Sequence, residues 1–281
     1  MSEAIIDVHV SFGATAFAPK WGDYTEVRSA LRARGIVSAF LSSDLAARYD
    51  PVSGNDTLAD ALGAADDSAL CGWLVLHPDR TEDANHQLRR HLSSGRRFVG
   101  AALYADPLTG VPLTLRSAQE VITAYRRFSR PLLIETQSAE AMYEAAKIAQ
   151  EVGTNIRVIA SGMGGEEWRE AIDLAAKPLN LFLDISGALT PEKIEYAIDT
   201  LSGTRKLLFA SGAPGTDPAA VLGMLNDLSL SAEDREKILS GNALRLFDLG
   251  DFIPAPVLVD DAPESPWAGP TTSANSSLRP M

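Results

Sequence analysis

Eight short apolar runs, rich in β-branched residues, recur along this chain and constrain its fold more than any other feature. Their starts lie roughly 25 to 35 residues apart, which is the length of one strand, one helix and the loops between them. Such regular spacing predicts strands that alternate with helices rather than separate blocks of each. The runs are Ala4–Val8, Ile36–Leu41, Leu70–Leu76, Phe98–Tyr104, Leu132–Thr136, Ile156–Ala160, Leu181–Ile185 and Lys206–Ala210.

Helical patterns fill several of the intervals between these runs. Over Ala139–Val152, apolar residues recur three or four positions apart with charged residues opposite them. Thr190 is a candidate N-cap for a helix over Pro191–Leu201, with the proline at its first position. A capping-box pattern at the start of Ser231–Gly241 predicts another helix, with the glycine as its end. The interval between the second and third runs gives a less clear pattern.

Eight alternations of strand and helix predict an α/β fold, a (β/α)8 TIM barrel over residues 1–253. A doubly wound open sheet is the alternative, but that fold has no need of eight evenly spaced units. From Pro254 onward, proline and serine accompany glycine, threonine and aspartate, a composition that does not form a packed core. Residues 254–281 are therefore interpreted as a tail, either disordered or an arm that lies along a partner.

Charge and cysteine content limit the classes of partner and the cellular compartment expected for this chain. A net charge of −12 makes nucleic acid and anionic membrane surfaces poor partners, because both repel an acidic protein. The single cysteine, Cys71, allows no internal disulfide and fits a reducing compartment. The chain shows no signal-peptide pattern at its start and no apolar stretch of about 18 residues. We expect a cytoplasmic protein.

Polar residues at the ends of the apolar runs are the candidates for chemistry, because a barrel of this kind works at the carboxyl ends of its strands. Asp7, His9 and Ser11 lie two positions apart and would share one face of their strand. Glu135 and Asp184 end later runs. Carboxylates beside one histidine can act as acid and base, or bind a hard ion such as magnesium or manganese. The candidate catalytic residues are Glu135, His9 and Asp184.

Each candidate also has a purely structural interpretation. Asp7 and Asp184 could hydrogen-bond to loop backbone, and Glu135 could be paired or solvated. His77 precedes Pro78 at the end of the third run. It either borders the barrel mouth or forms a hydrogen bond before the turn that the proline favours.

Five segments resemble the amidohydrolase superfamily, in the branch that includes metal-dependent hydrolases and nonoxidative decarboxylases. The resemblance extends from Ile5 to about Leu249. The family reads Asp-x-His-x-His at the first segment, His-Met-Gly-Gly at the fourth and Gly-(Ser/Thr)-Asp-Ala-Pro at the fifth. The segments here are Ile5–Ser11, Arg97–Leu103, Pro131–Thr136, Val158–Gly165 and Leu207–Pro214, and Ile238–Phe247 resembles the family's closing helix with its Gly-Asn-Ala turn.

The resemblance implies that the family's metal site is largely lost. Ser11, Glu135 and Ser161 stand where the family has histidines, and Gly212 stands where it has an aspartate that serves as ligand and base. Two remaining ligands, His9 and Glu135, would rarely hold a catalytic ion. We therefore expect no metal or other cofactor unless the site has been rebuilt. The expected pocket residues around the candidates are Asp7, Ser11, His77, Ser161 and Gly212.

Two functions from different classes follow, with a third close to the first. The leading hypothesis is a degenerate amidohydrolase-like barrel that serves as a structural or regulatory subunit. Its homo- or hetero-oligomer would include a metal-competent amidohydrolase-like paralogue. The alternative is an active hydrolase or decarboxylase that acts on a small acid through a rearranged site around His9, Glu135 and Asp184. A protein that senses a small ligand in the old pocket is the third hypothesis.

Overall fold

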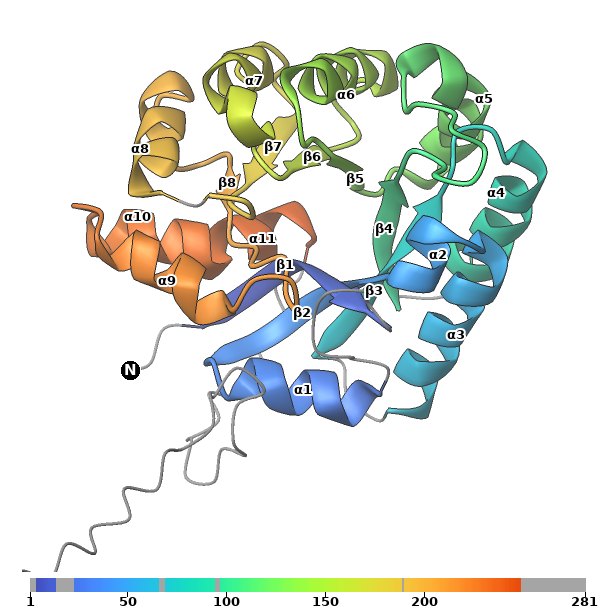
Figure 1. Ribbon diagram of the computed structural model, residues 1–281, viewed down its shortest axis with the longest axis horizontal. Helices are drawn as coiled ribbons and strands as arrows, with labels where there is room; N and C mark the ends of the chain where they lie inside the picture. The colour runs from blue at the N-terminus through green and yellow to red at the C-terminus, as the bar shows by residue number, and fades with distance from the viewer. Residues whose placement is uncertain (1–3, 14–22, 66–68, 94–96, 189, 249–281) are drawn as a thin grey trace, which may run out of the picture.

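The computed structural model describes residues 4–13, 23–65, 69–93, 97–188 and 190–248. Its strands form one parallel sheet in the order β1-β2-β3-β4-β5-β6-β7-β8, and helices cover the outside (Figure 1). This arrangement confirms the predicted (β/α)8 barrel. The boundary at residue 253 and the tail over 254–281 lie outside the described residues. The strands are β1 (Ile5–Phe12), β2 (Ile36–Ser43), β3 (Leu70–Leu76), β4 (Phe98–Leu103), β5 (Leu132–Glu135), β6 (Val158–Ser161), β7 (Leu181–Asp184) and β8 (Leu207–Leu208).

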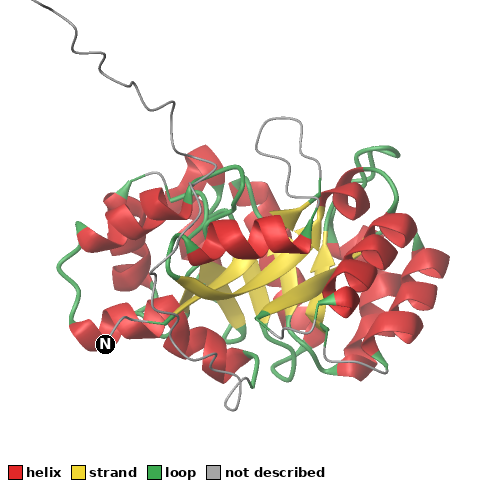
Figure 2. Ribbon diagram, turned by 90° about the horizontal axis from the view of Figure 1, so that it is seen from below, coloured by secondary structure: helices red, strands yellow, loops and turns green. Residues whose placement is uncertain are grey.

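Helices follow the strands and lie around the sheet (Figure 2). No helix in the described part of the chain is long and apolar enough to cross a membrane. The α-helices are α1 (Tyr24–Arg32), α2 (Asp44–Arg48), α3 (Pro51–Ala64), α4 (Thr81–Gln87), α5 (Leu115–Tyr125), α6 (Ala139–Val152), α7 (Trp168–Ala175), α8 (Pro191–Thr200), α9 (Pro218–Asn226), α10 (Ala232–Glu236) and α11 (Asn242–Leu246). Short π-helical and 3-10 segments are η1 (Leu88–Leu92), η2 (Arg126–Phe128), η3 (Gly165–Glu167) and η4 (Lys237–Gly241).

The three predicted helices are present, but one predicted cap and one predicted helix end were wrong. Helix α6 has the predicted bounds, and Ser231 caps α10 by accepting a hydrogen bond from the Asp234 amide. Thr190 precedes α8, although its side chain makes no capping hydrogen bond. Gly241 does not end the last helix: it keeps helical angles, φ −58° and ψ −40°, and the chain continues through η4 into α11.

The interval that the sequence left unclear holds two helices, α2 and α3. Ser43 caps α2 by accepting a hydrogen bond from the Ala46 amide. Asp50 caps α3 by accepting from the amides of Val52 and Ser53. Two caps only seven residues apart divide this interval, so it shows no single helical period. Residues of helix α2 lie at the mouth of the barrel.

Apolar side chains form two layers, one inside the barrel and one between the sheet and the helices. On β5, Leu133 belongs to the inner cluster, whereas Leu132 and Ile134 belong to the outer cluster. Parallel strands are buried on both faces, which explains why the runs read as continuously apolar. Trp73 and Phe40 fill the inner layer with their rings edge to face, 6.1 Å apart. Apolar side chains therefore fill the interior of the barrel below its mouth.

Backbone hydrogen bonds close the barrel between its first strand and the segment that follows its last. The Val8 amide donates to the Phe209 carbonyl at 3.0 Å, and the Gly212 amide donates to the His9 carbonyl at 3.1 Å. The Ser11 amide donates to the Ala213 carbonyl at 2.7 Å. These bonds bring residues near Gly212 beside His9, at the carboxyl ends of the strands.

Candidate functional site at the barrel mouth

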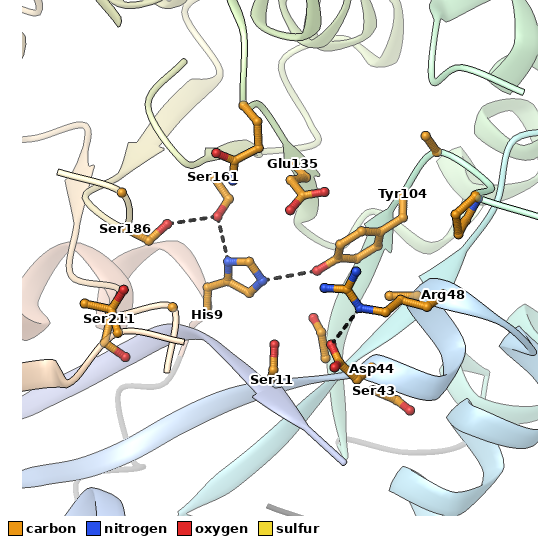
Figure 3. A pocket seen from close by; sticks show the side chains of 18 residues that line it. His9, Ser11, Ser43, Asp44, Arg48, Tyr104, Glu135, Ser161, Ser186 and Ser211 are labelled. Atoms are coloured by element: carbon orange, nitrogen blue, oxygen red, sulfur yellow. Dashed lines mark hydrogen bonds and ion pairs between the residues drawn. The ribbon is translucent and has the colours of Figure 1, made fainter. Parts of the chain in front are cut away.

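A pocket of about 450 Å³ opens at the carboxyl ends of the strands (Figure 3). Its walls come from nearly every strand of the barrel, so residues distant in sequence meet there. Hydroxyl groups dominate the lining, in contrast to the apolar core beneath. The hydroxyl-bearing residues are Ser11, Ser42, Ser43, Tyr104, Ser161, Ser186, Ser211 and Thr216.

His9 lies in the middle of this pocket, with both ring nitrogens in hydrogen bonds (Figure 3). Its Nδ1 is 2.6 Å from the Ser161 hydroxyl, and its Nε2 is 3.1 Å from the Tyr104 hydroxyl. The imidazole is 12% exposed. Three strands or strand ends, β1, β4 and β6, therefore fix the orientation of one ring that still faces the cavity.

The Asp184 carboxylate lies behind His9 and is fully buried. Its Oδ1 accepts hydrogen bonds from the Ser186 amide at 3.0 Å and the Ser186 hydroxyl at 2.5 Å. Its Oδ2 is 3.8 Å from His9 Nδ1. Burial raises the pKa of Asp184, and the nearby His9 works against that rise. The carboxylate can stabilise a positive charge on the imidazole because little water separates them.

Close contact between two loops places Ser161 and Ser186 beside each other. A side chain at Gly187 would bring its Cβ to 2.9 Å from the Gly162 carbonyl oxygen, and the φ of Gly187 is +73°. Glycine is required there because both the contact and the left-handed backbone exclude a side chain. The Lys193 ammonium joins the same loops, at 3.0 Å from the Gly165 carbonyl and 3.4 Å from the Gly187 carbonyl.

Charged side chains lie on the rim of the pocket. Arg48 Nε is 3.6 Å from Asp44 Oδ1, and the arginine side chain is 64% exposed. Burial raises the pKa of Asp44, with Arg48 and His9 opposing that rise. Glu135, at the end of β5, lines the same pocket and is exposed. The rim thus offers the Arg48 guanidinium and the Glu135 carboxylate to a ligand, with the buried Asp44 beside the arginine.

Most of the sequence candidates meet at this mouth. His9, Ser11, Glu135, Ser161 and Gly212 all line the pocket. The third candidate catalytic residue, Asp184, does not line it and contacts it only through its serine and histidine neighbours.

Asp7 and His77 require correction, since neither lines the pocket. The Asp7 carboxylate is buried and accepts hydrogen bonds from the Ser211 amide and hydroxyl and from the His9 amide. A register shift in β1 between Asp7 and Val10 breaks the alternation that would have placed Asp7 and His9 on one face. His77 is also buried, with its Nε2 2.8 Å from the Ala46 carbonyl oxygen, so it supports α2 from below.

Tyr104, Ser186, Asp44 and Arg48 line the pocket but were not predicted from the sequence. Tyr104 directly follows β4 and Ser186 comes two residues after β7, so a polar residue after an apolar run was the available signal. Asp44 and Arg48 lie on α2, which the sequence pattern did not reveal. Helix α2 has only five residues, which is too short to show the hydrophobic period of about 3.6 residues from which a helix is predicted.

The side chains at this mouth do not fit the metal of the family that the sequence resembles. Both His9 nitrogens are engaged by hydroxyl groups, and Ser161 and Gly212 supply no imidazole or carboxylate. Among the residues that the structure describes, no three His, Cys, Asp or Glu side chains are grouped to hold an ion. Catalytic zinc sites ordinarily use three protein ligands. The absence of a bound metal stays a prediction.

Solved structures share this fold across most of the chain. A 5-carboxyvanillate decarboxylase from Sphingomonas paucimobilis is 14% identical, with a TM-score of 0.67 over 88% of this chain and 99% of that one. A dihydroxybenzoic acid decarboxylase from a Polaromonas species, with manganese and 2-nitroresorcinol bound, is 18% identical, with a TM-score of 0.67 over 89% and 98%. A probable 2-pyrone-4,6-dicarboxylic acid hydrolase from Acinetobacter baumannii, with citric acid bound, is 15% identical, with a TM-score of 0.62 over 87% and 99%. At these identities, the likeness shows a common fold.

Family membership follows from the sequence itself. No curated protein sequence is significantly similar to this chain. The model of the amidohydrolase family matches residues 6–249, which include nearly all of the described barrel. That match confirms the resemblance drawn from the strand ends and the closing helix. The chain belongs to the amidohydrolase family.

Proposed function

We propose that this protein is an enzyme that hydrolyses or decarboxylates a small carboxylic acid, with the His9 imidazole transferring the proton. The observation that carries this proposal is the position of His9: its ring is fixed by Ser161 and Tyr104 yet faces a polar pocket. Hydrolysis requires a proton to leave the attacking water, and decarboxylation requires a proton to reach the carbon that loses carbon dioxide. A histidine held near a buried carboxylate serves either transfer.

The substrate class is supported by the pocket and by the similar structures. Those structures are named for 5-carboxyvanillate, dihydroxybenzoic acid and 2-pyrone-4,6-dicarboxylic acid, which are all small ring compounds that carry carboxyl groups. The cavity of about 450 Å³ falls in the usual range for small-molecule sites. Arg48 supplies a guanidinium at its rim, and guanidinium groups pair well with carboxylates.

A comparison of two histidine variants tests the proposal. The purified full-length protein, freed of metal by a chelator, is incubated with 5-carboxyvanillate, 2,6-dihydroxybenzoate and 2-pyrone-4,6-dicarboxylate, and products are followed by proton NMR. His9→Gln should lower kcat by at least about 100-fold, the usual contribution of a general acid or base. His86→Gln changes an exposed residue of α4 and should leave the rate unchanged. Equal turnover by His9→Gln and the unaltered protein contradicts the proposal.

A noncatalytic subunit is the second candidate, and the replaced ligands favour it. Ser11, Ser161 and Gly212 occupy family ligand positions while the barrel that carried them is intact. The partner would be a metal-competent amidohydrolase-like barrel, in a homo- or hetero-oligomer. Native mass spectrometry of the full chain, and of a chain truncated before Pro254, tests it. A second barrel bound only by the full chain, without turnover of any acid, supports this candidate, and a monomer that turns over an acid excludes it.

A further inference from the structure

A chain of hydrogen bonds joins the buried Asp184 to the pocket through four polar side chains. The Ser186 hydroxyl donates to Asp184 Oδ1 at 2.5 Å. The Ser186 and Ser161 hydroxyl oxygens are 3.1 Å apart, and the Ser161 oxygen is 2.6 Å from His9 Nδ1. His9 Nε2 is 3.1 Å from the Tyr104 hydroxyl, which borders the cavity. The connected groups come from β1, β4, β6 and β7 or the residues that directly follow them.

Counting protons fixes the directions of these bonds when Asp184 is ionised and the His9 ring is neutral. A hydroxyl has one proton to donate, and Ser186 gives its proton to Asp184. Ser161 must therefore donate to Ser186, because otherwise no proton would lie between the two oxygens. Ser161 then has only lone pairs for His9, so the Nδ1 atom carries the ring proton. In the neutral ring Nε2 carries no proton, so the Tyr104 hydroxyl donates a hydrogen bond to it.

We propose that His9 is held as the Nδ1–H tautomer and acts through Tyr104, whose hydroxyl is the catalytic group that contacts the substrate. Ser161 and Ser186 are positioning residues that select this tautomer. The assignment to a reacting substrate rests on the proposed function, whereas the tautomer does not. The phenolic oxygen has lone pairs free for the pocket because its own proton points toward the imidazole.

The transfer moves two protons in one direction without any change in oxidation state. A substrate or water O–H bond breaks as a new O–H bond forms on the Tyr104 oxygen. The original Tyr104 proton passes to His9 Nε2, which becomes part of an imidazolium. The products are the conjugate base of the substrate, a neutral tyrosine and a charged His9. In decarboxylation the substrate O–H proton first reaches His9 by this route and then returns through Tyr104, so that a C–H bond forms as the bond from carbon to carbon dioxide breaks.

The surroundings of the pair favour coupled transfer over a free phenolate. Burial raises the pKa of Tyr104, the Glu135, Asp44 and Asp184 carboxylates raise it further, and the Ser42 hydroxyl opposes this rise. A phenolate would therefore be costly, whereas an imidazolium gains from Asp184 Oδ2, which is 3.8 Å from Nδ1. The charge that develops during the reaction is thus placed on His9.

Nitrogen-15 NMR of the imidazole tests the tautomer without any need for turnover. The full-length protein is labelled on its histidine rings, and His9 is assigned by the signals that His9→Gln removes. At about pH 8.5, where an ordinary imidazole is neutral, Nδ1 should appear protonated and Nε2 unprotonated. Ser186→Ala should shift the population toward the Nε2–H tautomer, and Ser186→Thr, which keeps the hydroxyl, should restore the original state. Ser11→Ala is the matched control, because Ser11 lines the pocket but is not one of the ring's partners.

The role of Tyr104 has its own readouts. Tyr104→Phe should move the Nε2 resonance toward that of a nitrogen without a hydrogen bond. With an acid that is turned over, this variant should lower kcat by about 100-fold or more and leave KM nearly unchanged. A protonated Nε2 in the unaltered protein, or a Ser186→Ala variant with the same tautomer, overturns the inference. Full kcat in Tyr104→Phe also overturns it while leaving the proposed function intact. The predicted tautomer with no turnover of any acid counts against the proposed function alone.

Discussion

The carboxylate of Asp7, on the first strand, accepts hydrogen bonds from the amide and hydroxyl of Ser211, although the two residues are 204 positions apart. Ser211 follows the last strand, so this contact joins the two edges that must meet to close the barrel. Neighbouring backbone bonds, such as that from the Gly212 amide to the His9 carbonyl, run along the same seam. Asp7, which the sequence predicts to line the pocket, is therefore part of the barrel closure beneath it.

Removal of the Ser211 hydroxyl should weaken the closure between β1 and the segment that follows β8. Above pH 7, where Asp7 is ionised, Ser211→Ala leaves one oxygen of a buried carboxylate without its partner, and such a loss costs roughly 1.5 to 3 kcal/mol of the free energy of unfolding. Urea denaturation followed by circular dichroism measures the change. Ser11→Ala, which removes a pocket hydroxyl away from Asp7, is the control. A Ser211→Ala variant as stable as this control would show that the contact contributes nothing to closure.

Stability should fall as pH rises from about 4 to 7, because of Asp7. Burial raises the pKa of Asp7 to about 7, from 3.8 as its ordinary value. Between these values the unfolded chain has released a proton that the folded protein keeps, so rising pH favours unfolding. The two pKa values imply a loss of roughly 4 kcal/mol, which levels off above pH 7.

Asp7→Asn provides the comparison for this pH dependence, because it removes the titrating group and should flatten the slope over the same range. A residual slope of the same sign is expected from Asp184 and Asp44, whose pKa values are also raised by burial. Denaturation midpoints at several pH values give the measurement. An unchanged slope in Asp7→Asn would mean that Asp7 is ionised in the folded protein.

Because of Arg48, the protein should bind acids more tightly than their neutral analogues. Arg48→Gln removes the guanidinium of the pocket rim and should weaken binding of 2,6-dihydroxybenzoate by roughly tenfold or more, as for the loss of a charge-assisted pair. The carboxamide analogue should be much less affected. Isothermal titration calorimetry supplies both dissociation constants.

Two further variants control for indirect effects of losing Arg48. Arg48→Gln combined with Asp44→Asn avoids leaving Asp44 without its ion-pair partner. Arg89→Gln changes an exposed arginine of η1 and should leave binding unaltered. If the acid and its carboxamide lose affinity equally in Arg48→Gln, Arg48 does not recognise the carboxylate.

Asn242 should stabilise the fold through its hydrogen bonds to the backbone at β8, the last strand of the barrel. Its side-chain amide donates to the carbonyls of Thr204 and Leu207, both at 2.8 Å, and the residue is buried. Asn242→Ala leaves two carbonyls without this donor and should lower the free energy of unfolding by roughly 2 kcal/mol or more. Asn226→Ala, at an exposed position, is the control for chemical denaturation. Equal stability of the two variants would show that neither hydrogen bond contributes.

Asn242 also shows why Gly241 failed as a predicted helix end. A glycine after a helical pattern usually takes a left-handed conformation that stops the helix. Here Ile238 and Leu239 are buried, and Asn242 is fixed to Thr204 and Leu207, so the backbone at Gly241 stays helical. Tertiary contacts overrode a local preference worth only about 1 kcal/mol.

The sequence by itself determined the barrel, because burial of both faces of a parallel strand leaves a continuous apolar run wherever a strand occurs. It also identified His9, Glu135 and Ser161 as residues of the mouth, since the carboxyl ends of such strands converge. Only the tertiary structure decided how they act. The shift in β1 that separates Asp7 from His9 is set by its pairing with β2, and the contacts of His9 with Ser161 and Tyr104 reach across the mouth of the closed ring of strands. Those pairings join residues up to 152 positions apart, beyond the reach of any local pattern.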